Sequence, residues 1–550
     1  MPAPTPVSLI ARGVSLTRAD RTVLRDVDLV VTERSRLAVV GPNGIGKSTL
    51  LAVLAGELDP DAGSVRRTPP TARVGLVRQQ LDRTMGPTVR DLLAQRTGVA
   101  AAQATFDDAT ATLAADEAGA ADRYDDALAA WLASGAADLD ARIGVVADEL
   151  GLDPVVLDRS PADLSGGEAG RVGLAAVLLS RFDVVLLDEP TNDLDQDGLA
   201  RLERWLADTP AGVVLVSHDR RFLERTVGAV LELDEHDHTA TVFEGGWEAF
   251  VTERATARHH AEERHGAYVA ERDRLAARAR RQREWATKGL GRAKKRPSDG
   301  DKIRRAMNIA QTEKLAGKAK ATERAIERLE AVDKPWEGWE LRFAIAAAER
   351  SGSVVGRLEG AIVRRGDFAL GPVDLDLAWA ERVALAGPNG SGKTTLIGAL
   401  LGRVPLAAGS AHLGPGVVVG ELDQRRHGLD RPDVDVARAF QDASGLTTAE
   451  VRSVLAKFGL DAEAIGRPAA SLSPGERTRA QLALFQARGV NLLVLDEPTN
   501  HLDLPAIEQL EQALASYTGT LVLVSHDRRF CEAVAVDRTV DLGAGDLGAG

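Results

Sequence analysis

The chain has 550 residues, of which 44 % are apolar and 27 % charged, and its formal net charge is −13. At roughly 100 to 200 residues per domain, this length predicts about three globular domains. No run reaches the ~20 consecutive apolar residues of a bilayer-spanning helix, the N-terminus lacks the pattern of a signal peptide, and one cysteine excludes a disulfide framework or a cysteine-rich metal site. We therefore expect a cytoplasmic protein.

The first motif is a phosphate-binding loop between a predicted strand and a predicted helix. The apolar run 37–40 leads into the sequence GPNGIGKST, and an apolar, helix-forming run follows. In such loops glycines let backbone NH groups cradle phosphates, the lysine neutralises the β- and γ-phosphates, and the next hydroxyl holds Mg²⁺. The residues expected to bind the nucleotide are Gly41, Asn43, Gly44, Gly46, Lys47, Ser48 and Thr49.

The next hundred residues carry weaker signals. Gln79 lies 32 residues after Lys47 at the end of a short apolar run, which by itself indicates only a surface position. Residues 101–150 hold 11 Asp or Glu and two Arg. Because affinity for nucleic acid comes chiefly from neutralising phosphates, we interpret residues 97–150 as a solvated, acidic helical insertion rather than a nucleic-acid-binding arm.

Three further motifs complete the first set. The sequence LSGGE at residues 164–168 precedes a helical pattern and the apolar run 184–187, which ends in Asp188 and Glu189. On a buried strand beside a phosphate loop, Asp188 can order the Mg²⁺ shell and Glu189 can polarise the water that attacks the γ-phosphate. Another apolar run, 213–216, ends in Ser217 and His218, and beside the other motifs we expect His218 to be functional rather than structural.

A basic segment then interrupts this acidic chain. Residues 271–330 hold 19 Lys or Arg against 9 Asp or Glu, and eight of the eleven lysines fall between residues 288 and 334. The pattern predicts two charged helices joined by a glycine-rich tip at 288–302, an antiparallel hairpin. The reversed sign of the charge favours a polyanionic partner over a merely solvated hairpin. The tip residues expected to meet it are Lys288, Arg292, Lys294, Lys295, Arg296 and Lys302.

The first set of motifs recurs in the same order after residue 350. The second phosphate loop supplies Gly387, Asn389, Gly390, Gly392, Lys393, Thr394 and Thr395. Gln424, the sequence LSPGE at 472–476, Asp496, Glu497 and His526 follow. The interval from the serine of LSGGE or LSPGE to the glutamate is 24 residues in both copies, and from that glutamate to the histidine it is 29. Two unrelated domains would not match so closely, so the chain contains an internal repeat.

These motifs resemble those of the ATP-binding cassette family over nearly the whole chain outside the basic segment. The resemblance implies an α/β fold with two P-loop cassette domains, each with a helical subdomain, that close head to tail around two ATP molecules with Mg²⁺. Each composite site pairs the phosphate loop of one copy with the LSGGE-type signature of the other. Both copies keep the glutamate and the histidine, so we expect both sites to hydrolyse ATP to ADP and phosphate.

The resemblance also assigns roles to individual residues. Site one combines Lys47, Ser48, Gln79, Asp188, Glu189 and His218 with Ser473 and Gly475 of the second signature. Site two combines Lys393, Thr394, Gln424, Asp496, Glu497 and His526 with Ser165, Gly166 and Gly167 of the first. The catalytic residues are Glu189, Glu497, His218 and His526. The Mg²⁺ ligands are Ser48, Gln79 and Asp188 in one site and Thr394, Gln424 and Asp496 in the other.

The sequence departs from the family pattern in two places. Arg18 and Arg364 stand where we expect an aromatic residue to stack on adenine; a guanidinium can also stack on a base, so the preference for ATP over GTP stays open. Pro474 replaces the first glycine of the second signature, and its missing NH removes a possible donor at site one. We therefore expect slower or looser closure at that site.

Tandem cassettes, DEPTN sequences and a basic helical linker together are similar to the ABC-F group. The domain boundaries are then 1–248 for the first cassette, 249–340 for the basic hairpin linker and 341–550 for the second cassette. Members of this group act on the ribosome: ATP closes the cassettes, the linker reaches toward peptidyl-tRNA and the peptidyl-transferase centre, and hydrolysis releases the protein. Some regulate translation and others protect ribosomes against antibiotics. The expected partners are rRNA and peptidyl-tRNA, contacted by a monomer that does not insert into membranes.

Two alternative functions compete with this interpretation. A tandem ATPase subunit of a membrane transporter would share the cassettes but would generally need only a connector where the basic hairpin stands. A DNA-repair or chromosome-organising ATPase would generally carry zinc-binding cysteines or very long coiled coils, and the chain has neither pattern. Copurification with ribosomes or with a membrane protein separates the first alternative from the ABC-F interpretation.

Overall fold

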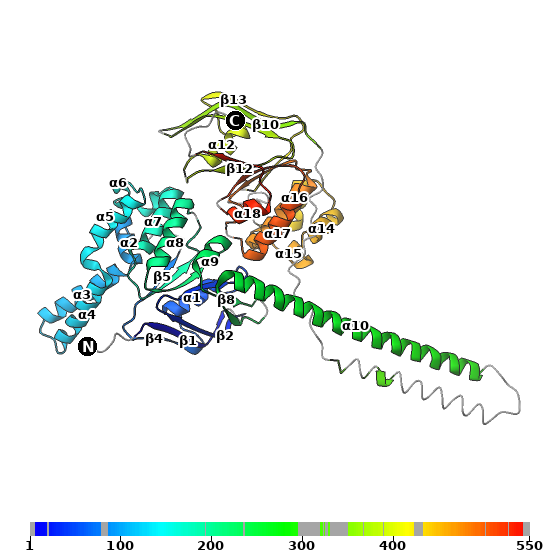
Figure 1. Cartoon of the computed structure of the whole chain (residues 1–550), viewed down its shortest axis with the longest axis horizontal. Helices are drawn as coiled ribbons and strands as arrows, with labels where there is room; N and C mark the ends of the chain where they lie inside the picture. The colour runs from blue at the N-terminus through cyan, green and yellow to red at the C-terminus, as the bar shows by residue number, and fades with distance from the viewer. Residues whose placement is uncertain are drawn as a thin grey trace. The chain divides into compact units, whose positions relative to one another are not determined.

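The structure is a computed structural model that describes residues 6–18, 21–78, 86–192, 194–234, 237–294, 320–322, 324, 328–329, 350–366, 368–388, 390–422, 433–500, 502–525 and 527–542. By its internal contacts the chain divides into two units, Met1–Glu248 with Trp339–Gly550, and Ala249–Gly338. The first unit holds two similar α/β cassettes (Figure 1). In the part of the chain that the structure describes, no helix combines enough length with enough apolar character to cross a membrane.

Cassette one is built around a six-stranded sheet in the order β5-β6-β7-β3-β8-β9. Its strands are β3 (Arg36–Val40), β5 (Val74–Arg78), β6 (Val184–Asp188), β7 (Gly212–Val216), β8 (Ala229–Leu233) and β9 (Ala240–Glu244). Strand β9 pairs antiparallel with β8, and the other pairs are parallel. The runs of valine and leucine in β6 and β7 are buried almost throughout, as expected for parallel strands covered on both faces.

A smaller antiparallel sheet in the order β2-β1-β4 lies beside the large one. It consists of β1 (Ser8–Arg18), β2 (Arg21–Thr32) and β4 (Ala62–Thr68). Buried and exposed residues largely alternate along β1 and β2, so each strand presents one apolar face. Those faces, helix α1 (Lys47–Ala55) and strands of the large sheet enclose one hydrophobic core.

The helices of cassette one include the acidic insertion. They are α2 (Val89–Arg96), α3 (Val99–Ala114), α4 (Ala120–Ser134), η1 (Ala136–Asp138), α5 (Leu139–Glu149), α6 (Pro154–Leu157), η2 (Pro161–Asp163), α7 (Gly166–Leu179), α8 (Gln196–Asp208) and α9 (Arg220–Thr226). Helices α3, α4 and α5 cover most of residues 97–150. Phe106 of α3 stacks on Trp131 of α4 with ring centroids 5.5 Å apart, so an aromatic contact joins this helical pair.

Cassette two repeats the plan with sheets β11-β10-β13 and β14-β15-β16-β12-β17. The strands are β10 (Val354–Arg365), β11 (Phe368–Ala378), β12 (Arg382–Ala386), β13 (Ala408–Leu413), β14 (Val419–Leu422), β15 (Leu492–Asp496), β16 (Thr520–Val524) and β17 (Arg538–Asp541). The helices are α12 (Lys393–Leu400), α13 (Val436–Ser444), α14 (Thr448–Lys457), α15 (Ala462–Gly466), η4 (Ala469–Ser471), α16 (Pro474–Ala487), α17 (Leu504–Ala515) and α18 (Arg528–Ala533). The expected fold, two P-loop cassettes of α/β class, is confirmed.

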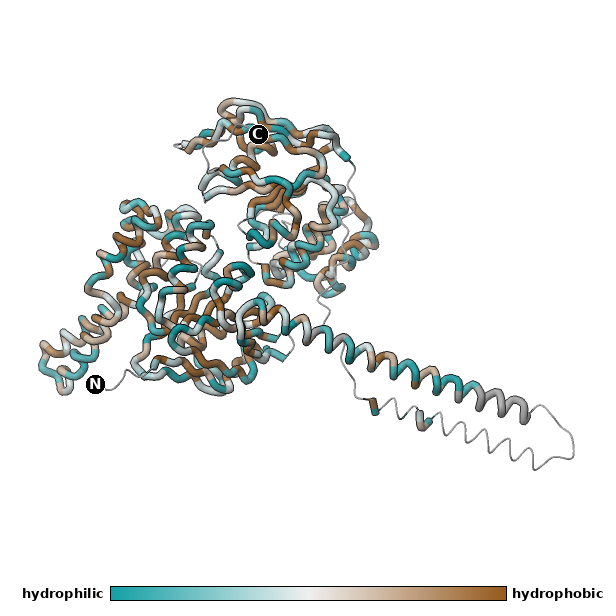
Figure 2. The backbone as a smooth tube through the Cα atoms, in the orientation of Figure 1, coloured by the Kyte–Doolittle hydropathy of each residue, from teal (hydrophilic) through white to brown (hydrophobic). Residues whose placement is uncertain are grey.

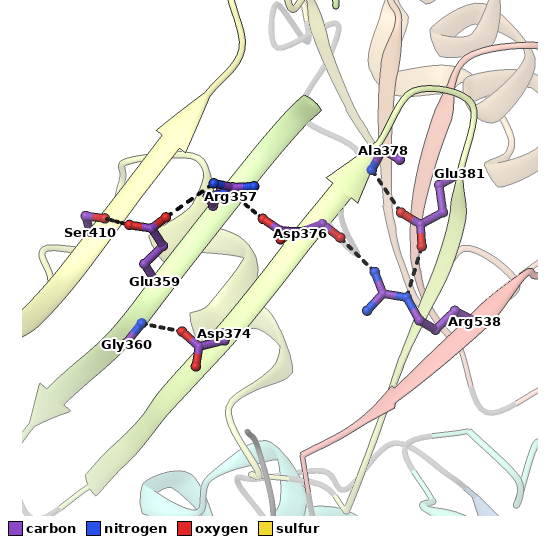
Figure 3. Close-up of polar contacts among 9 residues, drawn as sticks. All are labelled: Arg357, Glu359, Gly360, Asp374, Asp376, Ala378, Glu381, Ser410 and Arg538. Carbon is purple, nitrogen blue, oxygen red and sulfur yellow. Dashed lines mark hydrogen bonds and ion pairs between the residues drawn. The ribbon is translucent and has the colours of Figure 1, made fainter. Parts of the chain in front are cut away.

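Polar contacts tie the two sheets of cassette two together (Figure 3). Arg538 of β17 donates to the backbone oxygen of Asp376 in β11 at 2.7 Å and to Glu381 Oε1 at 2.9 Å. The other carboxylate oxygen of Glu381 accepts from the NH of Ala378 at 2.9 Å. These bonds link the end of the antiparallel sheet to the edge of the parallel sheet that carries the phosphate loop.

The basic linker begins with helix α10 (Gly246–Lys294), which has 49 residues. Trp247 and Phe250 at its start are buried, with 4 % and 1 % of their surface exposed. Hydrophilic residues predominate along the coloured part of α10 beyond this start, whereas apolar residues concentrate in the cassette sheets (Figure 2). Most of the second helix expected in the hairpin, including Ile303, Met307 and Leu315, lies outside the described residues.

Candidate nucleotide sites

Each phosphate loop connects an inner strand of its sheet, β3 or β12, to a helix that begins at the motif lysine. Gly46 has φ 120° and Gly392 has φ 100°, a left-handed region that favours glycine. A Cβ atom at Gly46 would approach Val23 Cγ1 to 2.6 Å, and one at Gly392 would approach the ring of Phe368 to 2.9 Å. Gly44 and Gly390 face open space on their Cβ side. The loops thus combine a tight turn with an open cradle that suits a phosphate chain.

The two loop lysines lie in matching environments. Lys47 Nζ donates to the carbonyl of Gly41 at 2.7 Å, and Lys393 Nζ donates to that of Gly387 at 2.7 Å. Burial lowers the pKa of each lysine, and the neighbouring carboxylates Glu189 and Glu497 partly oppose this shift. A buried cation gains most from a charged partner, so both ammonium groups are suited to bind an anionic phosphate.

The hydroxyl after each lysine pairs with the first acid of the following motif. Thr394 Oγ1 donates to Asp496 Oδ2 at 2.8 Å, and Ser48 hydrogen-bonds Asp188 in the same way. Burial raises the pKa of Asp188, and the Ser48 hydroxyl opposes that rise. A hydroxyl beside a carboxylate offers the oxygen ligands that Mg²⁺ prefers, with phosphates and water completing its shell. Among the described residues, no three His, Cys, Asp or Glu side chains gather in a group that could hold a metal ion.

The two glutamates share an unusual backbone conformation. Glu189 has φ 51° and Glu497 has φ 48°, although non-glycine residues rarely adopt positive φ and the conformation is strained. The NH of Glu189 donates to Val216 O at 3.0 Å, and that of Glu497 to Val524 O at 2.8 Å, which holds each residue against the next strand. His218 Nε2 lies 3.0 Å from Glu189 Oε1. The expected catalytic pair of site one is therefore brought together.

The signatures begin two helices with identical caps. Ser165 accepts from the NH of Glu168 while the Glu168 carboxylate accepts from the NH of Ser165. Ser473 and Glu476 make the same reciprocal bonds at the start of α16. Pro474 occupies the first turn of that helix, where the missing NH costs no intrahelical bond. The proline is therefore compatible with the helix, and its expected effect on closure stays a prediction.

A cavity of about 250 Å³ near site two is lined by residues of both cassettes. Its walls include Gly166 and Gly167 of the first signature together with Gly390 and Glu497 of cassette two. His218 and Asp219 of cassette one and Asp527 of cassette two also line it. Burial and the charge of Asp527 raise the pKa of Asp219 to about 6. Residues of the first signature and of the second phosphate loop therefore line the same cavity.

Site one has a direct bond between cassettes that the motif analysis missed. The NH of Asn43 in the first phosphate loop donates to Asp503 Oδ2 at 2.9 Å, while Asp503 Oδ1 caps α17 through the NH of Ala506. In cassette two, burial lowers the pKa of Lys393 and the charge of Asp195 in cassette one opposes this shift. Asp195 and Asp503 are the last residues of the repeated DEPTN-x-L-D sequence. Their equivalent positions in the two copies are the sequence feature from which these contacts between cassettes could have been predicted.

Most of the remaining predicted residues lie outside the part of the chain that the structure describes. Gly475 is described, and it lines a small cavity with residues of α16 and α17. Gln79, Gln424, Asn389 and His526 lie outside the described residues. The same holds for the tip residues Lys295, Arg296 and Lys302, and Lys288, Arg292 and Lys294 are described only by their backbone in α10. Their proposed contacts remain predictions.

The residue that lies against the second phosphate loop is Phe368 rather than Arg364. A cavity of about 330 Å³ is lined by Phe368, Lys393, Thr394, Asp496 and Glu497, and Arg364 is not among its lining residues. Arg364 lies on β10, opposite Ala369 of β11, whereas Phe368 begins β11. Arg18 likewise ends β1 as an exposed residue. Phe368 precedes Lys393 by 25 residues, and the residue at the same distance before Lys47 is Thr22 rather than an aromatic residue.

We expect Phe368→Ala to weaken nucleotide binding at site two. Base stacking on an aromatic side chain is worth about 1–3 kcal/mol, so the apparent KM for ATP should rise roughly 5- to 100-fold with little change in kcat. The measurement is steady-state hydrolysis in a Glu189→Gln background, where site two is the remaining hydrolytic site. Thr22→Ala is the matched control and should leave this KM unchanged. An unchanged KM in Phe368→Ala would contradict the stacking role.

Comparison with known proteins agrees with this geometry. Residues 24–192 and 370–500 match the family model described as ABC transporter. The tylosin resistance ATP-binding protein TlrC of Streptomyces fradiae is 35 % identical over 95 % of both chains. The energy-dependent translational throttle protein EttA of Mycobacterium tuberculosis is 31 % identical over 95 % of this chain and 89 % of its own length. The chain belongs to the ABC-F group of ATP-binding cassette proteins.

Solved structures support the fold of this ABC-F protein. The archaeal ribosome recycling factor aABCE1, in its complex with the stalk protein aP1, superposes with a TM-score of 0.56 at 19 % identity. The match covers 96 % of this chain and 87 % of that one. ABC ATPase domains bind and hydrolyse ATP, typically with Mg²⁺, so this general activity follows from the family.

Proposed function

We propose that this ABC-F protein is a ribosome-associated ATPase with two composite sites. ATP draws the cassettes together, the closed form binds the ribosome, and hydrolysis releases it. The cavity that contains the first signature, the second phosphate loop and Glu497 supports head-to-tail pairing, and the bond from Asn43 to Asp503 supports the same pairing at site one. The fold positions donors for phosphate on one cassette and a helix N-terminus on the other.

The hydrolytic step is assigned to the two glutamates. Glu189 and Glu497 follow the strands β6 and β15 and lie beside the hydroxyl–aspartate pairs that would hold Mg²⁺. Mg²⁺ would supply charge neutralisation at the β- and γ-phosphates. Each glutamate is proposed to orient the attacking water and accept its proton. His218 lies close enough to Glu189 to fix the direction of that carboxylate.

The ribosome is proposed as the partner because of the linker and the relatives together. The basic segment 271–330 gives an otherwise acidic protein one site that favours RNA phosphates. The full-length similarity to a translational throttle protein is the observation that carries the assignment. We propose that the linker acts near peptidyl-tRNA and the peptidyl-transferase centre, with Lys288, Arg292, Lys294, Lys295, Arg296 and Lys302 as its RNA-contacting tip.

Ribosome cosedimentation tests this proposal. The Glu189→Gln/Glu497→Gln variant should retain ATP and remain closed, so it should pellet with ribosomes in ATP and stay in the supernatant in ADP. Parallel purification from detergent-solubilised membranes tests the transporter alternative. Failure of the variant to bind ribosomes in ATP, or a stable membrane-protein partner in place of ribosomes, would overturn the ribosome assignment.

We propose antibiotic protection as the specific form of this function, on the basis of the similarity to one resistance protein. The tylosin resistance protein is 35 % identical over nearly its whole length, whereas the translational throttle protein is 31 % identical. Expression in a tylosin-sensitive bacterium should raise the inhibitory concentration of tylosin and leave that of a drug with a non-ribosomal target unchanged. No change for tylosin, with ribosome binding intact, would favour general regulation of translation instead.

A further inference from the structure

A buried ion pair joins the two cassettes beside site one. Arg220 at the start of α9 donates through Nη1 to Glu511 Oε2 on α17 at 3.3 Å, and its Nη2 pairs with Oε1 of the same carboxylate. The side chains are 7 % and 14 % exposed. Two parallel bonds between a guanidinium and a carboxylate form a strong and directional contact. The contact between Arg220 and Glu511 is also largely buried.

The internal repeat contains a second copy of both residues. From the signature serine onward, equivalent residues of the two cassettes differ by 308 in residue number. Arg528 is therefore the counterpart of Arg220, and Glu511 is the counterpart of Glu203. A symmetric structure would pair them. Instead Arg528 donates to Gln196 Oε1 at 3.1 Å, and Glu203 pairs within its own cassette with Arg225 Nη1 at 3.1 Å. Arginine and glutamate residues at equivalent positions of the two cassettes therefore have different partners.

One substitution between the copies explains this difference. The counterpart of Arg225 in cassette two is Ala533. Arg225 lies in the last turn of α9, where it forms an ion pair with Glu203. Ala533, the last residue of α18, has no charged side chain that could pair with Glu511. Glu511 therefore pairs with Arg220 of the other cassette. The different residues at positions 225 and 533 therefore account for the different pairing that the structure shows.

The pair lies next to the residues of site one. Arg220 follows His218 by two residues, and the N-cap of α17 is Asp503, which binds the NH of Asn43 in the first phosphate loop. Helix α17 is therefore attached to cassette one at its N-terminus and again near its middle. At the position of the repeat where Arg220 meets Glu511, Arg528 instead donates to the exposed side chain of Gln196 at the start of the counterpart helix α8.

We propose that Arg220 and Glu511 form a one-sided clasp, a positioning pair that holds α17 against site one so that site one releases nucleotide more slowly than site two. This inference rests on the proposed pairing of the cassettes. Opening site one separates two buried charges from each other, and the loss of such a pair acts mainly on the dissociation rate. Arg529 and Glu224 also pair across the cassettes, but their side chains are 41 % and 30 % exposed, and such pairs contribute little.

Nucleotide chase on the isolated protein tests the clasp. The Glu189→Gln/Glu497→Gln protein is loaded with a fluorescent ATP analogue and mixed with excess ATP. We expect two dissociation phases of unequal rate. Lys47→Ala and Lys393→Ala variants, each of which disables one site, assign the slow phase to site one and the fast phase to site two. A single phase with equal rates at both sites would contradict the clasp.

Exchanging the residues at 225 and 533 then gives opposite effects. Ala533→Arg adds an exposed arginine that should capture Glu511, and we expect the slow phase to accelerate about tenfold while the fast phase stays unchanged. Arg225→Ala should free Glu203 for Arg528 and slow the fast phase. A slow phase unaffected by Ala533→Arg would show that the ion pair does not hold site one closed.

A charge exchange separates the clasp from a general packing role. Arg220→Glu alone should accelerate the slow phase, and Arg220→Glu combined with Glu511→Arg should restore it, since the pair is re-formed in reverse. No restoration in a folded double variant would overturn the proposal. If every variant, including the parent, releases nucleotide rapidly at both sites, the proposed pairing of the cassettes itself fails. Slow release of nucleotide at equal rates from both sites would contradict the clasp but not the pairing of the cassettes.

Discussion

Replacing Glu189 and Glu497 together by glutamine is expected to lower ATP turnover by about 10²- to 10⁴-fold, because an amide cannot accept the proton of the attacking water. The nucleotide should stay bound, since glutamine keeps the shape of the side chain and the phosphate loops are unchanged. Phosphate release under saturating ATP is the measurement. Each single variant should retain the turnover of the other site.

A matched carboxylate away from the sites serves as the control. Glu149 is exposed at the end of α5, and Glu149→Gln removes the same charge without touching either nucleotide site. Its turnover should equal that of the parent. A double variant of Glu189 and Glu497 that keeps more than roughly a tenth of parental turnover, far above the loss expected for a missing general base, would show that these carboxylates do not activate water.

Neutralising the linker tip is expected to weaken ribosome binding strongly while basal ATP hydrolysis continues. Replacing Lys294, Lys295, Arg296 and Lys302 by glutamine removes four positive charges. If each meets an RNA phosphate, the slope of log affinity against log salt should fall by about 3 to 4, and binding at moderate salt should drop on the order of 10²-fold. Cosedimentation across a salt series measures both quantities.

The same helix offers a control of equal charge. Arg272, Arg274, Arg278 and Arg280 are exposed on α10, and replacing these four by glutamine changes the net charge by the same amount away from the tip. We expect a smaller effect on ribosome binding. Equal losses in the two quadruple variants would indicate non-specific attraction. A parallel loss of basal ATPase in the tip variant would indicate that the hairpin has only a structural role.

Local rules made several site residues predictable from the sequence. Asp188 and Glu189 follow a run of buried apolar residues, and a strand buried on both faces must end where such acids begin. Ser165 and Glu168 are three residues apart, the spacing of a capping box, so the signature was expected to open a helix and does. The phosphate loops follow from glycine and lysine spacing between a strand and a helix. Each of these inferences needs only residues that are close in sequence.

Features that depend on strand register and on tertiary packing were missed. The sequence placed Arg364 at the base-stacking position, and in the structure Phe368, four residues later, lines the cavity beside the second phosphate loop. Strand register follows from side-chain packing and turn geometry, and a shift of a few residues changes which side chain faces the site. The positive φ of Glu189 is also invisible in the sequence, since a glutamate in this conformation is stable only when the surrounding strands hold it.

The sequence by itself determined the two cassettes, their motifs, the basic linker and the resemblance to the ABC-F group, because equal spacings in two copies require equal folds. Only the tertiary structure decided which residues of one cassette reach the other. Asn43 and Asp503 are 460 residues apart, and Arg220 and Glu511 are 291 apart. The repeat supplies an equivalent arginine and glutamate on both sides, so the choice between them depends on local competition for each carboxylate. That competition is decided by packing in three dimensions, which the order of residues alone does not show.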